Sequence, residues 1–394
     1  MRRAYLTTLI TSLLVIGAFA LVYGRRTVQT GTLKVGFIYE GDESTPYTYN
    51  FALAEQALKE TYPDRIEVLS KSNVREEDAE TPALELIQKG CEIIFTNGYS
   101  EQIKEMASEH PEVQFCQASY RSSPDENAPD NYHTFKGRIY EGRYVSGIAA
   151  GLKLNEMIDN RVISRDEALV GYVAAYPTEE VISGFTAFIL GVRSVCPDAI
   201  MHVRYTQSWG SYSRERDAAE KLIEEGCRII GQHTDTIGPA LACEDAITQQ
   251  SVYHVGYNTG MLDVAPSSSI TGTCINWTPY IVGAVDALLQ GEVIEKHVEG
   301  TVNGNDIGAG FELDWVEMLE LNNHIAAHGT EEQMEKAIEN LKKGKINVFS
   351  GDYTGVDRKN ENDVIDLNKG YEENSNYSSP SFHYILKDVV IEDN

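Results

Sequence analysis

The stretch that decides the fold is Leu86–Ile94, LIQKGCEII, because it recurs as Leu222–Ile230, LIEEGCRII, at an offset of 136 residues (222 − 86). A second pair, Lys34–Ile38 (KVGFI) and Leu169–Val173 (LVGYV), matches at an offset of 135 residues (169 − 34). Two independent matches at nearly the same offset indicate an internal repeat. They predict two lobes that are wound in the same way.

Each lobe shows strands alternating with helices. Apolar residues at Phe51, Ala54, Ala57 and Leu58 lie on one face of a helix expected from about residue 49 to 61. The expected strands cover 33–40, 66–70, 92–97 and 113–118, then 169–175, 200–205, 228–233 and 252–257. Short apolar runs without clean alternation are typical of parallel sheets covered on both faces. With right-handed crossovers, the fold class is α/β, with two doubly wound parallel-sheet lobes joined by a multi-strand hinge.

The domain organisation follows from this order of elements. Residues 1–31 are a separate targeting segment, lobe 1 takes 32–137 plus about 262–292, and lobe 2 takes 138–261 plus about 293–350. Residues 351–394 form a polar C-terminal tail in which one late strand is expected within 382–390.

The N-terminus has the composition of a targeting segment. A basic start is followed by the uncharged, apolar run Ala4–Tyr23 and then by Arg25 and Arg26. A small-x-small cleavage site at Ala18-Phe19-Ala20 fits a signal peptide, while twenty apolar residues also suffice for a membrane anchor. Both interpretations stay open, and both predict an exported protein at the cell surface or in the periplasm.

Composition narrows the classes of partner. The chain has 33 Lys plus Arg and 60 Asp plus Glu, a net charge of −27, which argues against nucleic acid and anionic lipid surfaces. The six cysteines form no C-x-x-C pair, so free buried thiols are expected, with a disulfide as the alternative. Phosphate-loop, dinucleotide and nucleophile-elbow motifs are absent from the sequence, and no enzyme activity, cofactor or metal site is predicted.

A ligand is expected where the carboxyl ends of the strands of the two lobes face each other. The residues that follow the strands are rich in Tyr, Trp, Asn and Asp and poor in Lys and Arg, which favours an uncharged planar ligand. The candidate ligand-binding residues are Asp42, Tyr47, Tyr49, Asn50, Tyr99, Trp209, His233, Asp235, Asn258, Asn276 and Trp277. Tyr47 and Trp209 are expected to stack on opposite faces of the ring.

Several of these residues have a structural alternative. Tyr47 could pack its loop over the sheet, and Trp277 could pack the hinge. Asp235 could cap the helix that follows it. His233 could be a satisfied histidine at a strand end. A purine base or nucleoside fits the candidate set best.

These residues also resemble a known family. The sequence is similar to the basic membrane protein family of ABC-transporter substrate-binding proteins, which includes PnrA-like nucleoside-binding lipoproteins. The similarity is carried by Gly41-Asp42 with Tyr47–Tyr49, the segment Gly137–Glu141, Trp209, Gln232–Asp235, Val255–Asn258 and Asn276-Trp277. The resemblance covers about residues 33–350 and is closest to the purine-binding branch. It implies the type 1 periplasmic binding protein fold.

The resemblance also implies a function. The protein would capture a purine nucleoside or base by hinge closure and deliver it to an ABC permease and ATPase in trans. Nucleoside-binding members commonly carry Asp at the position of Asn258 and Lys at the position of Asn276, so both departures favour a base or another planar ring over a nucleoside. The alternative is a membrane-anchored, ligand-sensing ectodomain for a similar planar ligand.

Overall fold

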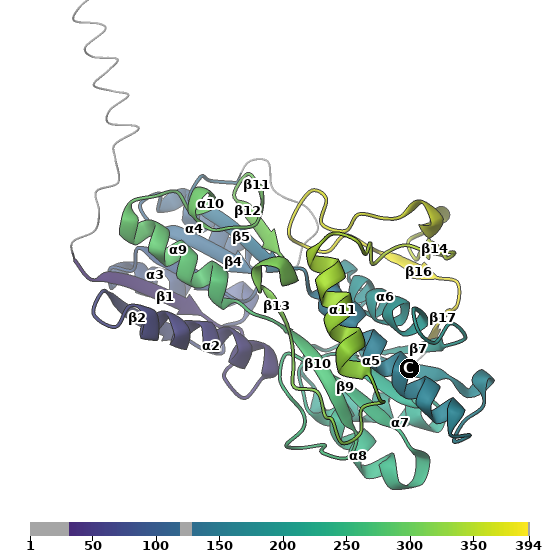
Figure 1. Cartoon of the computed structure of the whole chain (residues 1–394). Coiled ribbons are helices and arrows are strands. Elements are labelled where there is room, and N and C mark those ends of the chain that lie inside the picture. Colours follow the sequence, from purple (N-terminus) through teal and green to yellow (C-terminus); the bar gives the residue numbers. More distant parts are fainter. Residues whose placement is uncertain (1–30, 119–127, 393–394) are drawn as a thin grey trace, which may run out of the picture.

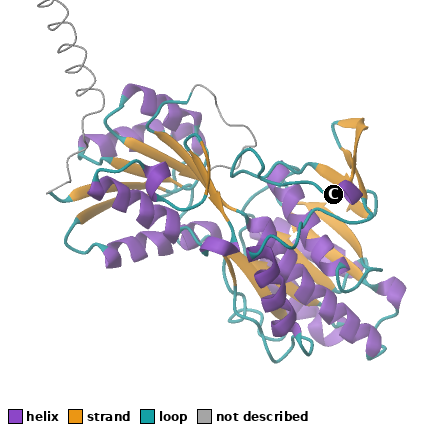
Figure 2. Ribbon diagram, turned by 45° about the horizontal axis from the view of Figure 1, so that its top comes forward, coloured by secondary structure: helices purple, strands orange, loops and turns teal. Residues whose placement is uncertain are grey.

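The computed structural model describes residues 31–118 and 128–392, and in this part of the chain two seven-stranded sheets form two lobes. Helices flank each sheet, and the two lobes meet at a narrow waist (Figures 1 and 2). The predicted α/β architecture with two largely parallel sheets is therefore confirmed.

The first sheet belongs to lobe 1 and has the strand order β11-β12-β5-β4-β3-β1-β2. All neighbours run parallel except β11, which pairs antiparallel with β12. The strands are β1 (Leu33–Ile38), β2 (Ile66–Lys71), β3 (Ile93–Thr96), β4 (Gln114–Ala118), β5 (Tyr132–Gly137), β11 (Thr301–Asn303) and β12 (Asp306–Ala309).

The second sheet belongs to lobe 2 and has the order β13-β10-β9-β8-β6-β7-β17. Here only β13 runs antiparallel to its neighbour. The strands are β6 (Leu169–Ala174), β7 (Ile200–Tyr205), β8 (Ile229–His233), β9 (Tyr253–Tyr257), β10 (Ser269–Ile275), β13 (Val316–Met318) and β17 (Val389–Glu392).

Helices cover both sheets. Lobe 1 carries α2 (Pro46–Thr61), α3 (Glu80–Gln88), α4 (Glu101–Glu109), α9 (Thr278–Gln290) and α10 (Ile294–His297), and lobe 2 carries α5 (Ile139–Asp159), α6 (Glu179–Arg193), α7 (Tyr212–Glu224), α8 (Gly238–Gln250) and α11 (Thr330–Lys342). The apolar faces of α2 and α6 are buried against their sheets through side chains such as Phe51 and Phe185.

The repeated sequence takes the same local structure in both lobes. Gly90 and Gly226 each end a helix with a left-handed backbone, at φ values of 88° and 96°, which is a conformation that glycine adopts without strain. Cys91 and Cys227 follow these glycines and are buried in corresponding cores. All six cysteines are free and buried, as expected, so the disulfide alternative is not adopted.

The chain passes between the lobes three times, and this corrects the predicted domain limits. It leaves β5 for α5 after Gly137, leaves β10 for α9 at Asn276-Trp277, and returns from β12 to β13 after Ala309. The segment 262–292 was expected in lobe 1, but β10 pairs with β9 in lobe 2 and only α9 packs in lobe 1. The segment 293–350 was expected in lobe 2, but β12 pairs with β5 in lobe 1.

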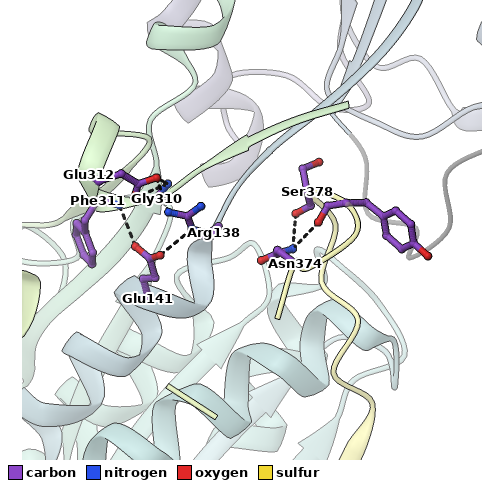
Figure 3. A network of polar contacts seen from close by, with 8 residues as sticks. Arg138, Glu141, Gly310, Phe311, Glu312, Asn374 and Ser378 are labelled. Carbon is purple, nitrogen blue, oxygen red and sulfur yellow. Dashed lines mark hydrogen bonds and ion pairs between the residues drawn. The ribbon is translucent and has the colours of Figure 1, made fainter. Parts of the chain in front are cut away.

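Polar contacts tie two of the three crossings together (Figure 3). The Arg138 Nε atom donates to Glu141 Oε1 at 2.8 Å, and Arg138 also forms an ion pair with Glu312. Glu141 Oε2 accepts from the Phe311 N–H at 2.9 Å. Since Arg138 and Glu141 flank one crossing and the other two residues lie on another, the network joins two hinge segments.

The C-terminal tail is structured, in contrast to the expectation of a polar tail with a single strand. It forms β14 (Thr354–Asp357), β15 (Asn360–Asp366) and β16 (Tyr384–Leu386), which make a third sheet, and β17 extends the sheet of lobe 2. The tail contacts both lobes. Ser378 Oγ donates to Asp306 Oδ1 in lobe 1 at 2.7 Å, and Glu373 accepts from Ser183 Oγ in lobe 2 at 2.7 Å.

The predicted signal or anchor in residues 1–31 lies almost wholly outside the described residues. Among the residues that the structure does describe, no helix combines the length and the apolar character needed to cross a membrane.

Candidate functional site

A cavity lies between the lobes at the carboxyl ends of their strands. Lobe 1 contributes Glu40, Tyr47, Glu76, Asn97 and Lys136, and lobe 2 contributes Glu180, Trp209, His233, Asp235 and Tyr257. Its volume is about 60 Å³, whereas pockets for small molecules commonly measure roughly 300–1,000 Å³. The structure is therefore a nearly closed form, and a ring-sized ligand enters only if the lobes move apart.

The wall from lobe 1 is organised by Asn97, which directly follows β3. Its Oδ1 atom accepts from the Glu40 N–H at 2.9 Å, and its carbonyl accepts from the Tyr47 hydroxyl at 2.7 Å. The Glu40 side chain crosses directly over Gly98, because a Cβ at residue 98 would lie 2.1 Å from Glu40 Oε1. Because Gly98 has no side chain, the Glu40 carboxyl group can occupy the space above it.

The wall from lobe 2 is aromatic. The ring centroids of Trp209 and His233 are 6.3 Å apart, and those of His233 and Tyr257 are 4.8 Å apart. Arg143 lies under this wall, with Cζ 3.7 Å from the centroid of the Tyr257 ring and Nη1 donating to the Gln232 carbonyl at 2.7 Å. A flat ligand can stack on such a surface.

A buried ion pair connects the lobes inside the cavity. Lys136 Nζ, at the end of β5, lies 2.7 Å from Glu180 Oε1 in the first turn of α6, and both side chains are less than 10% exposed. Burial by itself would raise the pKa of Glu180, but Lys136 outweighs it and holds the value at about 2. Burial and the charge of Arg143 lower the pKa of His233 to about 4, so its ring is neutral at physiological pH.

Two further carboxyl groups face the cavity without a basic partner among the described residues. Burial, reinforced by the charge of Glu76, raises the pKa of Glu40 to about 7. Burial also raises the pKa of Asp235 to about 7, although Asn258 Nδ2 donates to its Oδ1 at 3.1 Å. Both groups hold protons readily near neutral pH because ionisation inside the closed cavity is costly.

The structure brings four of the predicted site residues together in the cavity lining: Tyr47, Trp209, His233 and Asp235. Asn258 stands behind them and orients Asp235 from a left-handed backbone with φ 64°. Their role in binding stays a prediction, but they share one cavity.

The other predicted residues lie outside this lining. Asp42 accepts from Ser44 within its own loop, Tyr49 is 43% exposed, and Tyr99 bonds to Glu101. Asn50 and Asn276 donate to hinge carbonyls, and Trp277 is buried against the rings of Phe51 and Phe135. The structural alternative named for Trp277, packing at the hinge, describes its position in this closed form.

Sequence reasoning missed the charged members of the lining, Glu40, Glu76, Lys136 and Glu180. The candidates were taken from residues that follow strands, whereas Glu40 was the last residue of an expected strand, Lys136 lay in an expected connection between the lobes, and Glu180 was in the first turn of an expected helix. The expected scarcity of Lys and Arg holds for this lining, in which Lys136 is the one basic residue among those described, but the three glutamates were not expected there. A rule that includes the first turn of each helix and the last residue of each expected strand would have found Glu180 and Glu40.

Two groups of metal-ligand type occur among the described residues, His202 with Glu225 and Glu392, and Asp357 with Asp363 and His383. Neither group lines the cavity. The first joins β17 to β7, where Glu392 Oε1 is 2.9 Å from His202 Nδ1, and an ion pair with a structural role explains it.

Residues 32–348 match the family of ABC transporter substrate-binding proteins described as PnrA-like. This chain belongs to that family. The resemblance seen in the sequence is thereby confirmed, and the family is one of binding proteins rather than enzymes. Binding proteins of ABC importers work outside the cytoplasm and hand a small ligand to a permease and its ATPase. The match ends before the C-terminal tail, so the third sheet and β17 lie beyond it.

Two relatives of this chain are named for different ligands, a purine and glucose. A purine-binding protein of Brucella abortus is 30% identical over 324 residues, which cover 81% of this chain and 83% of that protein. A putative ABC transporter glucose-binding protein of Haloferax volcanii is 29% identical, over 76% of this chain and 69% of that protein. A solved solute-binding protein of Conexibacter woesei has a TM-score of 0.62 at 18% identity, covering 80% and 98% of the two chains, which supports the fold alone.

Proposed function

We propose that this protein captures a purine base or nucleoside outside the cytoplasm and delivers it to an ABC importer. The observation that carries the proposal is the pair Tyr47 and Trp209, which come from different lobes and line one cavity. A planar ring held between them would bridge the lobes, and hinge closure would exclude water from both faces. The purine-binding relative from Brucella abortus supports the same ligand class.

The order of events follows from the hinge. Three crossings let the lobes separate without unfolding, so the ring first docks on one lobe of an open form. Closure then brings the second aromatic wall and the opposing carboxyl groups onto the ligand. The closed form, in which the ligand is covered, is the one that a permease would recognise. Residues 4–23 would hold the protein at the membrane if they are retained after export.

Calorimetric titration of the full exported chain with adenine, guanosine and glucose tests this function. Saturable binding of a purine with no heat from glucose supports it. Binding of glucose alone would overturn it in favour of a sugar carrier, which the Haloferax volcanii relative suggests.

The second candidate is a membrane-anchored sensor for a similar planar ligand. The apolar run 4–23, if it stays attached, favours this role because a transport carrier does not require a spanning helix. N-terminal sequencing of the mature protein decides whether the run is cleaved. Uptake of labelled purine by cells that lack the protein separates transport from sensing, since only a carrier changes uptake.

A further inference from the structure

We propose that Asp357, Asp363 and His383 in the C-terminal tail form a binding site for a divalent transition-metal ion such as Zn²⁺. One ligand atom of each residue, a carboxylate oxygen or a ring nitrogen, lies within 4.8 Å of the other two. The group belongs to the third sheet, beyond the family match, and is separate from the cavity between the lobes. The inference is therefore independent of the proposed function.

The three-stranded sheet of the tail brings these residues together. β14 is its central strand, and Asp357 is the last residue of β14. Towards β15, Asp357 and Asp363 both adjoin the last regular pair, Val356 with Val364, at the point where the register shifts. Towards β16, Asp357 pairs with the first residue of that strand, which directly follows His383. Each ligand thus comes from a different strand or its border, and the hydrogen bonds of the sheet fix their spacing.

The two carboxylates are not neutralised by the protein. Like charges opposite each other on neighbouring strands destabilise a sheet. Two basic residues follow Asp357 directly, but Arg358 lies over the Tyr205 ring, with Cζ 5.4 Å from its centroid, and Lys359 Nζ lies 3.7 Å from Glu179. Within the described part of the chain, no ion pair joins a Lys or Arg to either aspartate. A bound cation would supply the missing positive charge.

The other group of metal-ligand type, His202 with Glu225 and Glu392, is different. Its glutamates face a basic residue, because Arg204 forms an ion pair with Glu225 and its Nη2 atom lies 4.0 Å from Glu392 Oε2. The histidine is also engaged there, with Nδ1 2.9 Å from Glu392 Oε1. In the tail group, among the described residues, the histidine forms no ion pair with a carboxylate although the ligand atoms are close. Only the tail group therefore needs an ion from outside.

The hydrogen bonds around the tail group leave ligand atoms available. His383 Nδ1 lies 2.9 Å from the Ser381 carbonyl, which can only accept, so Nδ1 carries the proton and Nε2 keeps its lone pair. A backbone carbonyl on the second ring nitrogen is a common arrangement for metal-binding histidines. Asp357 Oδ1 accepts from the N–H two residues later at 2.9 Å, and Asp363 Oδ1 accepts from the Tyr384 hydroxyl at 3.1 Å. The second oxygen of each carboxylate is left for an ion.

The ligand set selects the kind of ion. A histidine nitrogen together with carboxylate oxygens suits Zn²⁺ and its first-row neighbours, whereas Ca²⁺ and Mg²⁺ favour oxygen ligands alone. Zn²⁺ holds such atoms at roughly 2.0–2.2 Å, so two ligand atoms of one ion lie up to about 4 Å apart, and small side-chain rotations close the remaining gap. Asp357 and His383 also line a cavity of about 780 Å³ beside α6, through which the ion and a completing water molecule reach the site.

A bound ion would hold the tail sheet together. It would join the end of β14 and the middle of β15 to the start of β16, so its binding energy would add to the stability of the folded tail. Because β17 follows β16 and pairs with β7, the ion would also secure the tail on lobe 2.

The test is calorimetric titration of the untagged full chain, dialysed first against EDTA, with ZnCl₂ and separately with CaCl₂. We expect one equivalent of Zn²⁺ to bind, and Ca²⁺ to bind more weakly. His383→Gln and Asp363→Asn should each weaken Zn²⁺ binding by at least about tenfold, since loss of even an indirect partner of a metal ligand costs this much. His202→Gln, in the other group, and Asp64→Asn, an exposed carboxylate of lobe 1, are the matched controls.

Thermal unfolding separates loss of a ligand from loss of the fold. Zn²⁺ should raise the unfolding midpoint of the wild type and of both controls, and should leave the midpoints of the two site variants unchanged. The inference would be overturned by wild type that binds no Zn²⁺ at one equivalent, by site variants that bind Zn²⁺ as the wild type does, or by loss of binding in His202→Gln instead. Ca²⁺ binding as tight as that of Zn²⁺ would overturn the assignment to a transition metal.

Discussion

At the scale of single residues, the cavity contains two carboxyl groups, Glu40 and Asp235, whose pKa values are raised by loss of hydration and by neighbouring carboxyl groups. Glu40 has an ordinary pKa of 4.5 and a value of about 7 in the closed form. A carboxyl group with a raised pKa stabilises the folded form below its ordinary value and loses that contribution as the pH rises to the raised value. Glu40 and Asp235 thus make the closed form sensitive to pH between about 4 and 7.

We expect the wild type to lose thermal stability relative to Glu40→Gln as the pH rises from 5 to 8. In this range Glu40 loses a proton that the folded chain binds more tightly than the unfolded chain does, whereas glutamine does not titrate. Thermal unfolding followed by circular dichroism at several pH values measures the difference. A constant difference between the two proteins over this range would contradict the prediction.

Trp209 is the residue whose ring should contribute most to stacking. Trp209→Ala should weaken binding of a planar ligand by about 1–3 kcal/mol, the range for base–aromatic stacking elsewhere. Calorimetric titration measures the loss. Tyr212→Ala, which removes an exposed ring outside the cavity lining, serves as the control and should bind normally. Unchanged affinity in the Trp209 variant would remove it from the site.

At the scale of elements, the hinge depends on close packing of backbone segments. Gly137 lies where three crossings meet, and a Cβ there would be 2.8 Å from the Ile275 side chain and 2.9 Å from the Trp315 carbonyl. The Trp315 carbonyl belongs to the backbone, so it cannot turn aside as the end of a flexible side chain could. The glycine is therefore required by the approach of the crossings, not by its backbone angle.

Gly137→Ala should lower the free energy of unfolding by about 1–3 kcal/mol, as overpacking does in other cores. Urea denaturation measures the change. Gly260→Ala, where a Cβ meets no atom within 4 Å, is the matched control and should stay within about 0.5 kcal/mol of the wild type. Equal stability of the two variants would show that the hinge can adjust.

The inter-lobe pair of Lys136 and Glu180 should set the balance between open and closed forms. Removing one partner of a buried ion pair commonly costs about 3–5 kcal/mol, because the other charge is left buried. In Lys136→Met, opening of the lobes returns Glu180 to water, so the variant should open instead of unfolding. Small-angle X-ray scattering should show a larger radius of gyration without ligand.

The double variant Lys136→Met with Glu180→Leu provides the control, since it leaves no buried charge and should close again. A scattering profile of the single variant identical to that of the wild type would contradict a role of the pair in closure.

At the scale of the whole molecule, the C-terminal tail is part of the fold although it lies beyond the family match. Phe382 is fully buried, and its ring stacks on Phe349 with centroids 4.6 Å apart. β17 completes the edge of the sheet of lobe 2. The tail also contacts lobe 1 through Ser378 and Asp306, so it packs on both sides of the hinge.

Phe382→Ala should lower the free energy of unfolding by about 3–5 kcal/mol, as other buried Phe-to-Ala changes do. Denaturant unfolding monitored by fluorescence measures it. Val364→Ala, at a site that is 52% exposed, should have an effect within about 0.5 kcal/mol. A similar small effect of both variants would mean that the tail folds independently of the lobes.

The sequence by itself determined the two lobes and most of their strands and helices. Leu86–Ile94 and its repeat carry their own signals, namely apolar periodicity and a glycine that ends each helix, and such signals act over a few neighbouring residues. Aromatic candidates such as Tyr47 and Trp209 could be named from the sequence because both lie in the connection between a predicted strand and the helix that follows it.

Only the tertiary structure decided which segments cross the hinge and which charges face the ligand cavity. β12 joins lobe 1 because it pairs with β5, a strand distant in the sequence, and no local pattern encodes this pairing. Lys136 and Glu180 form an ion pair between the two lobes although they are 44 residues apart in the sequence (180 − 136). Contacts of this kind depend on the relative placement of two sheets, so the charge of the cavity became visible only in the folded chain.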